Sequence, residues 1–452
     1  MTIQEIINAI DGICLNPDKI GNTLIKDIFT DSRKSLTDGL FVPLVGESFD
    51  GHNYINQVYD KGALATLSSN KEIVDDRLIT IYVPDTKVAL LALAKYYSRK
   101  FERCVVAITG SVGKTTTKDM IATVLAQKLK VHKTEGNFNN EIGLPLTLFK
   151  VKPDDDVSVL EMGMNHFGEI SNLTLTAEPD IAIITNIGTS HIENLGSREG
   201  ILKAKLEILE GLKSDGIVLI NGDEPLLTQA KGNNIWVTYG LNPSNDYYAT
   251  DITYASTYVE AIFYSPLALF KLRVPAPGEH MVKNALAAIA VGELLGLTTT
   301  EIMDGIKSYK TGKMRMEITE LPNQITIIDD TYNASVDSMV AALKVLENIE
   351  TNSRKIAILG DMFELGIYSD KLHEEVGEVA NEMNIDCVYT IGNYAQKINQ
   401  GVTTCESEHF NTKELCIEQL PRIIRPGDVV LIKASRGMHL EQVVEAIGKV
   451  RY

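Results

Sequence analysis

The stretch that decides the fold is Cys104-Val105-Val106-Ala107-Ile108-Thr109-Gly110-Ser111-Val112-Gly113-Lys114-Thr115. It begins with a continuous apolar run, as expected of a strand buried in a parallel sheet. A glycine-rich loop and a Lys-Thr pair follow. Between residues 115 and 129, apolar residues recur at the spacing of a helix that is buried on one face. A strand, a glycine loop, Lys-Thr and a helix in this order are typical of a phosphate-binding loop.

This loop predicts the binding of ATP. Glycines let backbone N–H groups surround phosphate oxygens, Lys114 supplies a positive charge, and the threonine hydroxyl after it is a ligand for Mg²⁺. The general pattern has four residues between the first glycine and Gly-Lys, whereas only Ser111 and Val112 separate Gly110 from Gly113. A glycine turn beside an incidental surface lysine is the alternative, and the flanking strand and helix argue against it.

The rest of the chain indicates an α/β protein with mostly parallel sheets covered by helices. At about 150 residues per domain, 452 residues correspond to about three domains. We expect a small N-terminal α/β domain over residues 1–102, a central phosphate-loop domain over 103–313 and a Rossmann-like domain over 314–452. The apolar runs predict strands at 79–83, 157–160, 181–184, 217–220, 325–328, 356–359, 388–391 and 429–432, and helices at 88–101 and from near His280.

Composition excludes some classes of protein. The formal net charge of −17 makes the chain a poor binder of nucleic acid or of an anionic membrane, because both require a basic face. The five cysteines include no CxxC pair, which favours reduced thiols in the cytoplasm. The N-terminus lacks the pattern of a signal peptide, and no run of about 18 apolar residues predicts a membrane span.

Several acidic and basic side chains are further candidates for functional residues, including ligands of Mg²⁺. Glu161 ends the apolar run 157–160, and His191 follows the run 181–184. Ligands of open α/β sheets bind at the carboxyl ends of strands, where a carboxylate can hold Mg²⁺. A solvated strand-end acid and a structural histidine are the alternatives. Lys203 and Lys205 lie on the next predicted helix, for which a solvated face is the default interpretation.

Together these elements resemble the Mur ligase family, the ATP-dependent ligases that build the peptide of bacterial cell-wall precursors. The family's loop, Thr-Gly-(Thr/Ser)-x-Gly-Lys-Thr-(Thr/Ser), has the short glycine spacing of residues 109–116. Similar segments cover nearly the whole chain: Thr30-Asp31-Ser32-Arg33, Asn137-Phe138-Asn139-Asn140-Glu141-Ile142-Gly143, Glu161-Met162-Gly163-Met164-Asn165, Asp329-Asp330-Thr331-Tyr332-Asn333-Ala334, Gly360-Asp361-Met362-Phe363-Glu364-Leu365-Gly366 and Lys433-Ala434-Ser435-Arg436-Gly437-Met438.

The resemblance implies an amide-forming reaction. ATP phosphorylates the carboxylate of UDP-N-acetylmuramoyl-tripeptide, and the amine of D-alanyl-D-alanine attacks the acyl phosphate. The products are the pentapeptide precursor of peptidoglycan, ADP and phosphate. The sequence contains no Asp-Asn-Pro-Arg motif of the diaminopimelate-adding relative, which favours dipeptide addition. Two alternatives stay open: a related ligase that adds a single amino acid or polyglutamate, and an ATPase that drives a conformational change in a partner.

The resemblance also implies binding residues. Thr115, Glu161, His191 and a carbamylated Lys205 would hold two Mg²⁺ ions, with Lys203 as the competing lysine. The catalytic residues would be Lys114, Lys205, His191 and Glu161. ATP would contact Gly110, Ser111, Val112, Gly113, Lys114, Thr115, Thr116, Asn284, Arg315 and Asp330. The UDP-linked substrate and the dipeptide would contact Ser32, Arg33, Asp50, His52, Asn137, Asn140, Asn333 and Arg436, in a monomer whose third domain closes on ATP.

Two positions depart from the family pattern. Met281 stands where the family usually has asparagine, which removes a polar group near the nucleotide. Val336 stands where proline is common, after Asn333-Ala334-Ser335, and should change only the stiffness of the loop.

Overall fold

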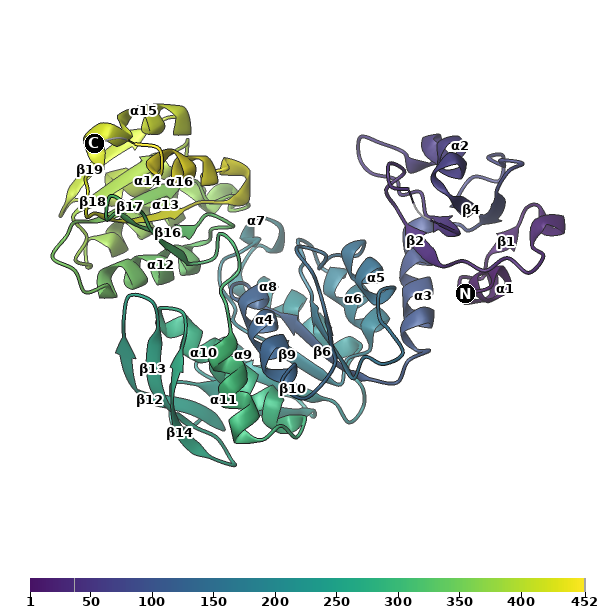
Figure 1. The fold of residues 1–452 in the computed structure, drawn as a ribbon, viewed down its shortest axis with the longest axis horizontal. Helices are drawn as coiled ribbons and strands as arrows, with labels where there is room; N and C mark the ends of the chain where they lie inside the picture. The colour runs from purple at the N-terminus through teal and green to yellow at the C-terminus, as the bar shows by residue number, and fades with distance from the viewer. Residues whose placement is uncertain (36, 451–452) are drawn as a thin grey trace.

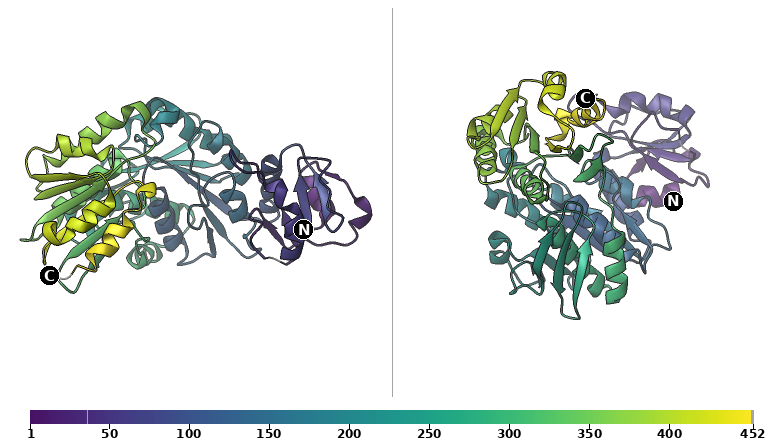
Figure 2. Two further views of the ribbon diagram at one scale, coloured as in Figure 1. Left: turned by 90° about the horizontal axis from the view of Figure 1, so that it is seen from above. Right: turned by 60° about the vertical axis from the view of Figure 1, so that its left-hand side comes forward.

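The computed structural model describes residues 1–35 and 37–450, and the strands of these residues form three β-sheets (Figure 1). The sheets built by the first and the last parts of the chain lie at opposite ends of the long axis, and the largest sheet lies between them (Figures 1 and 2). No helix in the described part of the chain combines the length and the apolar character needed to cross a bilayer. The five cysteines are free thiols.

The N-terminal sheet has the strand order β1-β5-β4-β3-β2. The strand β1 pairs antiparallel with β5, and the other pairs are parallel. The elements of this part are α1 (Ile3–Ala9), β1 (Ile13–Cys14), η1 (Pro17–Lys19), β2 (Asp27–Phe29), β3 (Gly39–Phe41), η2 (Gly51–Tyr54), α2 (Ile55–Val58), η3 (Tyr59–Lys61), β4 (Ala63–Ser68), β5 (Ile79–Tyr82) and α3 (Thr86–Ser98). The strand at 79–83 and the helix at 88–101 are confirmed.

The central sheet has the order β14-β13-β12-β11-β10-β9-β6-β8-β7. Its elements are β6 (Cys104–Thr109), α4 (Lys114–Leu125), β7 (Val131–Lys133), α5 (Gly143–Leu148), β8 (Val157–Glu161), α6 (Glu169–Ala177), β9 (Ile181–Ile184), α7 (Ile192–Leu195), α8 (Arg198–Leu206), η4 (Glu207–Glu210), β10 (Ile217–Asn221), α9 (Pro225–Gln229), β11 (Ile235–Gly240), β12 (Tyr247–Tyr254), β13 (Val259–Tyr264), β14 (Leu269–Val274), α10 (Glu279–Leu294) and α11 (Thr299–Ser308). The predicted central strands and the helix near His280 are confirmed.

Helices cover both faces of this sheet, as the packing of β6 illustrates. Successive residues of β6 point to opposite faces, so the two sets of side chains pack against different helices. Val106 and Ile108 pack in the core with α4, α10 and α11. Val105 and Ala107 pack in the core with α5, α6 and α8. The parallel sheet predicted from apolar runs is therefore confirmed.

The edge formed by β12, β13 and β14 is antiparallel and was not predicted. Burial alternates along β13, with every second side chain facing the core. An antiparallel edge with one solvated face lacks the continuous apolar run that identified the other strands.

The C-terminal sheet has the order β15-β16-β20-β17-β18-β19, with β15 antiparallel to β16 and the other pairs parallel. Its elements are β15 (Glu317–Glu320), β16 (Thr326–Asp330), α12 (Val336–Asn348), β17 (Lys355–Gly360), η5 (Gly366–Tyr368), α13 (Ser369–Ala380), β18 (Cys387–Ile391), α14 (Ala395–Gly401), β19 (Glu406–Phe410), α15 (Lys413–Ile423), β20 (Val429–Lys433), η6 (Arg436–Met438) and α16 (Glu441–Ile447). The carboxyl ends of β16, β17 and β20 approach the central sheet, and this approach forms the site described next.

Candidate active site

The phosphate-binding loop connects β6 to α4, as the sequence predicts. Gly110 has φ +150° and Gly113 has φ +83°, values that favour glycine. The segment after β9 holds the loop: Asn186 accepts the Val112 N–H at 2.9 Å, and Thr185 donates to the Val112 carbonyl at 2.7 Å. The loop is therefore preformed at the N-terminus of α4, where backbone N–H groups and the helix dipole favour an anion.

The variant Gly110→Ala is expected to disrupt this loop. A β-carbon at residue 110 would lie 1.9 Å from the Thr185 hydroxyl oxygen. The backbone conformation adds strain of about 1–3 kcal/mol. We expect a higher KM for ATP in an ADP-release assay and a lower thermal unfolding midpoint. Gly232→Ala is the control, because nothing lies within 4 Å of a β-carbon there. An unchanged KM for ATP would contradict the expectation.

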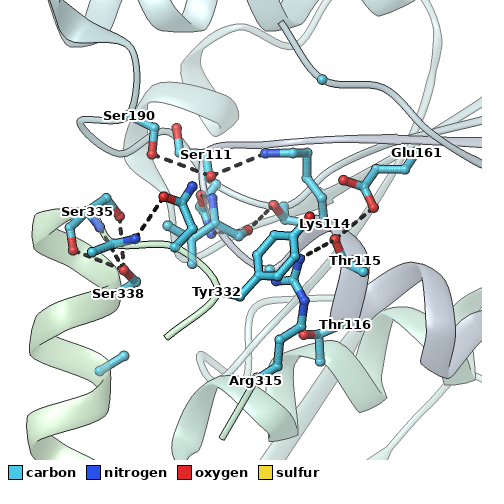
Figure 3. Close-up of a pocket in the computed structure, with 18 of the residues that line it drawn as sticks. Ser111, Lys114, Thr115, Thr116, Glu161, Ser190, Arg315, Tyr332, Ser335 and Ser338 are labelled. Atoms are coloured by element: carbon cyan, nitrogen blue, oxygen red, sulfur yellow. Dashed lines mark hydrogen bonds between the residues drawn. The ribbon is translucent and has the colours of Figure 1, made fainter. Parts of the chain in front are cut away.

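A cavity of about 600 Å³ surrounds the loop between the central and C-terminal sheets (Figure 3). The predicted site residues that line it are Ser111, Val112, Gly113, Lys114, Thr115, Thr116, Asn137, Asn140, Glu161, His191, Asn284, Arg315, Asp330, Asn333 and Arg436. The predicted residues outside the lining are Gly110, Lys205, Ser32, Arg33, Asp50 and His52. The structure thus brings together residues from two domains at one cavity.

Lys114 folds back over its own loop. Its ammonium donates to the Gly110 carbonyl at 2.7 Å and to the Ser111 carbonyl at 3.3 Å. Burial lowers the pKa of Lys114, and the charge of Glu161 opposes part of this effect. The bonds to loop carbonyls are ones that a phosphate oxygen can replace.

Thr115 and Glu161 form a pair of oxygen groups beside the lysine (Figure 3). The Thr115 hydroxyl donates to Glu161 Oε2 at 2.8 Å. Asn139 donates to the other carboxylate oxygen at 2.8 Å, and the Glu161 N–H donates to the Thr134 hydroxyl at 3.0 Å. The carboxylate is buried and held at both oxygens, so its orientation is defined by the fold.

The Thr115–Glu161 pair fits Mg²⁺. With Mg–O bonds of 2.0–2.1 Å, neighbouring oxygens of an octahedral ion lie about 3 Å apart. The two oxygens here are 2.8 Å apart. Within the described residues, no three His, Cys, Asp or Glu side chains gather as a complete ligand group. The pair therefore accounts for only part of a coordination shell, which suits an ion that usually retains waters and binds phosphates.

Arg315 reaches the same place from the C-terminal side. Its guanidinium donates to the Thr115 hydroxyl at 3.1 Å and stacks on Tyr332, with Cζ 3.9 Å from the ring centroid (Figure 3). The flanking residues Met314 and Met316 have φ +58° and +50°, a conformation uncommon for residues other than glycine. The strained connection into β15 directs the arginine into the cavity.

Asp330 is held by a buried ion pair. The Lys433 ammonium lies 2.5 Å from Asp330 Oδ2 and donates to the Asn333 carbonyl at 2.8 Å. The Met316 N–H donates to the other Asp330 oxygen at 3.1 Å. Lys433 therefore joins the ends of β16 and β20 and orients an acid that lines the cavity.

His191 meets an acid that belongs to the other domain. Its Nδ1 atom lies 2.5 Å from Glu364 Oε2. The close contact with His191 is the largest effect on the pKa of Glu364, which is lowered. His191 has φ +62° and Glu364 has φ +63°.

Burial distinguishes the two lysines of α8. Lys205 is 1% exposed, whereas Lys203 is exposed and lies over the Phe167 ring at 5.6 Å. Desolvation lowers the pKa of Lys205 well below its ordinary value, and the charge of Lys114 lowers it further. A neutral buried amine is the form that can react with CO₂, so the environment of Lys205 fits a carbamate.

Asn284 is buried and lines the cavity, with its amide engaged by neighbours. Its carbonyl oxygen accepts from the Thr117 hydroxyl at 3.0 Å, and its nitrogen donates to the Met281 sulfur at 3.6 Å. The Met281 sulfur is therefore the acceptor that this amide nitrogen uses. Val336 is the first residue of α12, a position where proline is also favoured, and it is buried in the core.

The predicted substrate-binding residues near the N-terminus form ion pairs and hydrogen bonds with neighbours in the N-terminal part of the chain. The Arg33 side chain is 88% exposed and pairs with Asp31 at 2.8 Å. This pairing lowers the pKa of Asp31 to about 2. His52 is buried: Nδ1 lies 2.6 Å from Asp50 Oδ1, and Nε2 accepts the Ser69 N–H at 3.0 Å. Ser32, Arg33, Asp50 and His52 are thus separate from the central cavity.

The remaining predicted residues lie around the rim. Asn137 and Asn140 are exposed, and the Asn140 side chain accepts the Gly143 N–H at 2.8 Å. Asn333 accepts the Ala334 N–H at 2.9 Å. The Arg436 side chain is 47% exposed and lies 3.0 Å from Glu441.

Sequence reasoning did not assign roles to several residues that shape the cavity: Asn139, Asn186, Glu364 and Lys433. Asn139, Glu364 and Lys433 lie within segments that resemble the family, and Asn186 follows the apolar run 181–184. Their position after a strand end was the available signal. Nothing in the sequence indicated which side chain each would contact.

The site combines a preformed phosphate loop, a Thr–Glu oxygen pair and the positively charged side chains of Arg315 and Lys433 from a second α/β domain. These features define a multidomain nucleotide-binding enzyme. The Mur ligase middle domain matches residues 108–292, and the Mur ligase, glutamate ligase domain, matches residues 314–436. The chain belongs to the Mur ligase family.

Similar proteins extend over the full chain. UDP-N-acetylmuramoyl-tripeptide–D-alanyl-D-alanine ligase of Bacillus subtilis is 40% identical over 98% of this chain and 97% of its own. The crystal structure of MurF from Acinetobacter baumannii has a TM-score of 0.93 at 31% identity and covers 99% of both chains. MurF ligase from Thermotoga maritima in complex with ADP has a TM-score of 0.85 at 31% identity, over 94% of this chain and 97% of that one.

Proposed function

We propose that this ligase joins D-alanyl-D-alanine to UDP-N-acetylmuramoyl-tripeptide with ATP, and releases ADP and phosphate. The observation that carries the proposal is the shared cavity, in which the phosphate loop faces Arg315 and the Lys433–Asp330 pair of the other domain. The identity of the substrates is supported by the names of relatives that are similar over nearly the full chain.

The first step makes the carboxylate reactive. The substrate carboxylate attacks the γ-phosphorus of ATP, ADP leaves, and an acyl phosphate forms. Such a transfer depends on positioning and on neutralising phosphate charge. The loop N–H groups and Lys114 would serve the phosphates, and Arg315, which donates to the Thr115 hydroxyl, would add a second positive charge. The remaining predicted contacts of ATP are Gly110, Ser111, Val112, Gly113, Thr115, Thr116, Asn284 and Asp330.

The second step forms the amide. The dipeptide ammonium first loses one proton to solvent, and the neutral amine attacks the acyl carbon. The tetrahedral intermediate then breaks its bond to the phosphate oxygen and expels phosphate, and the nitrogen loses a second proton to solvent as the amide forms. We assign Arg436 and Asn333, which both line the cavity, to the dipeptide, since an arginine fork suits a carboxylate. Closure of residues 314–452 on residues 103–313 would exclude water, which would otherwise hydrolyse the acyl phosphate.

We assign the metal-binding role to Thr115, Glu161, His191 and the carbamate of Lys205. Two bound Mg²⁺ ions would neutralise charge on the phosphate oxygens. In the carbamate, the neutral Lys205 amine bonds to the carbon of CO₂ and releases a proton. Burial of Lys205 and exposure of Lys203 support Lys205 as the modified residue.

We assign the UDP end of the substrate to residues 1–102, with Ser32, Arg33, Asp50 and His52 as contacts. Arg33 would exchange Asp31 for a phosphate, and His52 would shape the loop that Asp50 begins. Asn137 and Asn140 lie at the rim and would contact the peptide between the two ends. The site is assembled from one chain, so we propose a monomer, working in the cytoplasm where ATP is available.

An ADP-release assay with UDP-N-acetylmuramoyl-tripeptide and a panel of amines tests the substrate assignment. D-alanyl-D-alanine is expected to stimulate ADP release, whereas D-alanine, L-lysine and L-glutamate are expected to leave it at the level without amine. Mass spectrometry should show the pentapeptide product. Stimulation by a single amino acid and none by the dipeptide would favour the ligase that adds one residue. ADP release that ignores every amine would favour the ATPase.

A further inference from the structure

The segment 363–368 of the C-terminal domain, here called the Glu364 segment, contacts helix α7 (Ile192–Leu195) of the central domain and its two capping residues, His191 and Gly196. The Glu193 N–H donates to the Glu364 carbonyl at 3.4 Å, and the Tyr368 hydroxyl donates to the Gly196 carbonyl at 3.1 Å. Gly366 packs so closely on Glu193 that a β-carbon there would lie 2.8 Å from its side chain. These contacts hold the two domains together beside the cavity.

The Glu364 carboxylate ends next to the His191 ring. Its Oε2 atom is 2.5 Å from Nδ1, and Nδ1 is buried. Within the described part of the chain Nδ1 has no hydrogen bond of regular geometry, and Glu364 Oε2 is the carboxylate oxygen within reach of its proton. A neutral imidazole carries one proton, and a carboxylate acceptor at Nδ1 leaves Nε2 as the free lone pair.

Both residues of this contact are held in an uncommon backbone conformation. His191 has φ +62° and Glu364 has φ +63°. Left-handed conformations of such residues cost about 1–3 kcal/mol and persist where the surroundings impose them, often at functional sites. Both residues also line the cavity that contains the phosphate loop. The strain therefore lies where two domains meet at the proposed reaction centre.

We propose that Glu364 is a positioning residue, whose carboxylate accepts the Nδ1 proton of His191 and so leaves Nε2 free to bind a cation in the cavity. Carboxylates behind ligating histidines fix the tautomer and the ring orientation in this way. Because Glu364 comes from the C-terminal domain, the histidine becomes ready only when the two domains are docked. The use of Nε2 rests on the proposed function, whereas the tautomer does not.

The tautomer is measured directly by NMR of the full chain with ¹⁵N-labelled histidine, at a pH of about 8, above the ordinary imidazole pKa. No nucleotide, metal or substrate is added, so the result is independent of ligase activity. The signal of His191 is identified by its loss in His191→Gln. We expect the proton on Nδ1 in the wild type and a shift of the proton towards Nε2 in Glu364→Ala.

Kinetics supply the second measurement. Glu364→Ala is expected to lower kcat by about 10–100-fold, the effect typical of residues behind a ligand, with the KM for the amine unchanged. Glu364→Gln should recover most of kcat, because its amide oxygen still accepts the Nδ1 proton. Tyr368→Phe is the matched control, since it removes only the outer hydrogen bond of the same segment. It should keep the wild-type tautomer.

Three results would overturn the proposal. They are a wild-type ring with its proton on Nε2 or on both nitrogens, a tautomer that is unchanged in Glu364→Ala, and a Tyr368→Phe variant that shifts as Glu364→Ala does. The last would show that domain docking alone orients the ring. If D-alanyl-D-alanine fails to stimulate ADP release while the tautomer shifts as expected, the substrate assignment fails and the role of Glu364 stands.

Discussion

Replacing Lys114 with alanine is expected to lower the rate of ADP release by roughly a thousandfold, the upper end of the effect of removing one preorganised donor from a reacting phosphate or oxyanion. The ammonium lies within the loop and, among residues 1–35 and 37–450, it is bonded only to loop carbonyls, at 2.7 and 3.3 Å. Phosphate oxygens would take the place of those carbonyls. The loop contains no second lysine that could take over this role. Lys114→Arg should also be inactive, because a guanidinium differs from an ammonium in length and shape.

Folding of the Lys114→Ala variant is expected to be preserved. Burial lowers the pKa of Lys114, which means that the charged form is disfavoured in the folded chain. Its loss should leave the thermal unfolding midpoint close to that of the wild type. Lys130→Ala is the control for activity, because Lys130 is 64% exposed and pairs with Asp154 on the surface. Wild-type ADP release by a folded Lys114→Ala variant would remove the loop from the mechanism.

Replacing Lys205 with alanine should give the second large loss of activity, about a hundredfold or more. Even residues behind metal ligands change activity by roughly 10–100-fold, and we assign Lys205 to the ligand set itself. The lysine is 1% exposed, and its pKa is lowered by desolvation first and by Lys114 second. A charged ammonium would be unfavourable at this position, whereas a carbamate would supply an anionic oxygen.

Chemical rescue tests that assignment. A short carboxylic acid such as acetate should restore part of the ADP release in Lys205→Ala, because its oxygens can occupy the space of the carbamate. In the wild type, ¹³C-labelled bicarbonate should give a carbamate signal by NMR, and the variant should lack it. Lys203→Ala is the control and should behave as the wild type, since Lys203 is exposed. Full activity of Lys205→Ala without rescue would exclude the carbamate.

Much of the fold could be predicted because its strands are buried on both sides. The strands β6, β8 and β9 consist mostly of apolar residues and are buried along nearly all of their length, and such runs are recognisable without neighbours. The antiparallel edge of β12, β13 and β14 was missed for the opposite reason. One side of those strands faces solvent, so their composition is mixed.

The site was predicted in part. Residues that act through their own chemistry within a short motif, such as Lys114 and Thr115, could be named from the sequence. Residues that act by holding another residue could not. Asn139 contacts Glu161 across 22 positions, and Lys433 contacts Asp330 across 103 positions. No local pattern records a pairing of that kind.

The sequence by itself determined the phosphate loop, because glycine, lysine and threonine at this spacing carry both the backbone geometry and the chemistry in consecutive residues. Only the tertiary structure decided which lysine of α8 is buried and which acid faces His191. Burial depends on the layers packed above a helix, and the contact between His191 and Glu364 depends on the docking of two domains. Both are products of long-range packing, which adjacent residues do not encode.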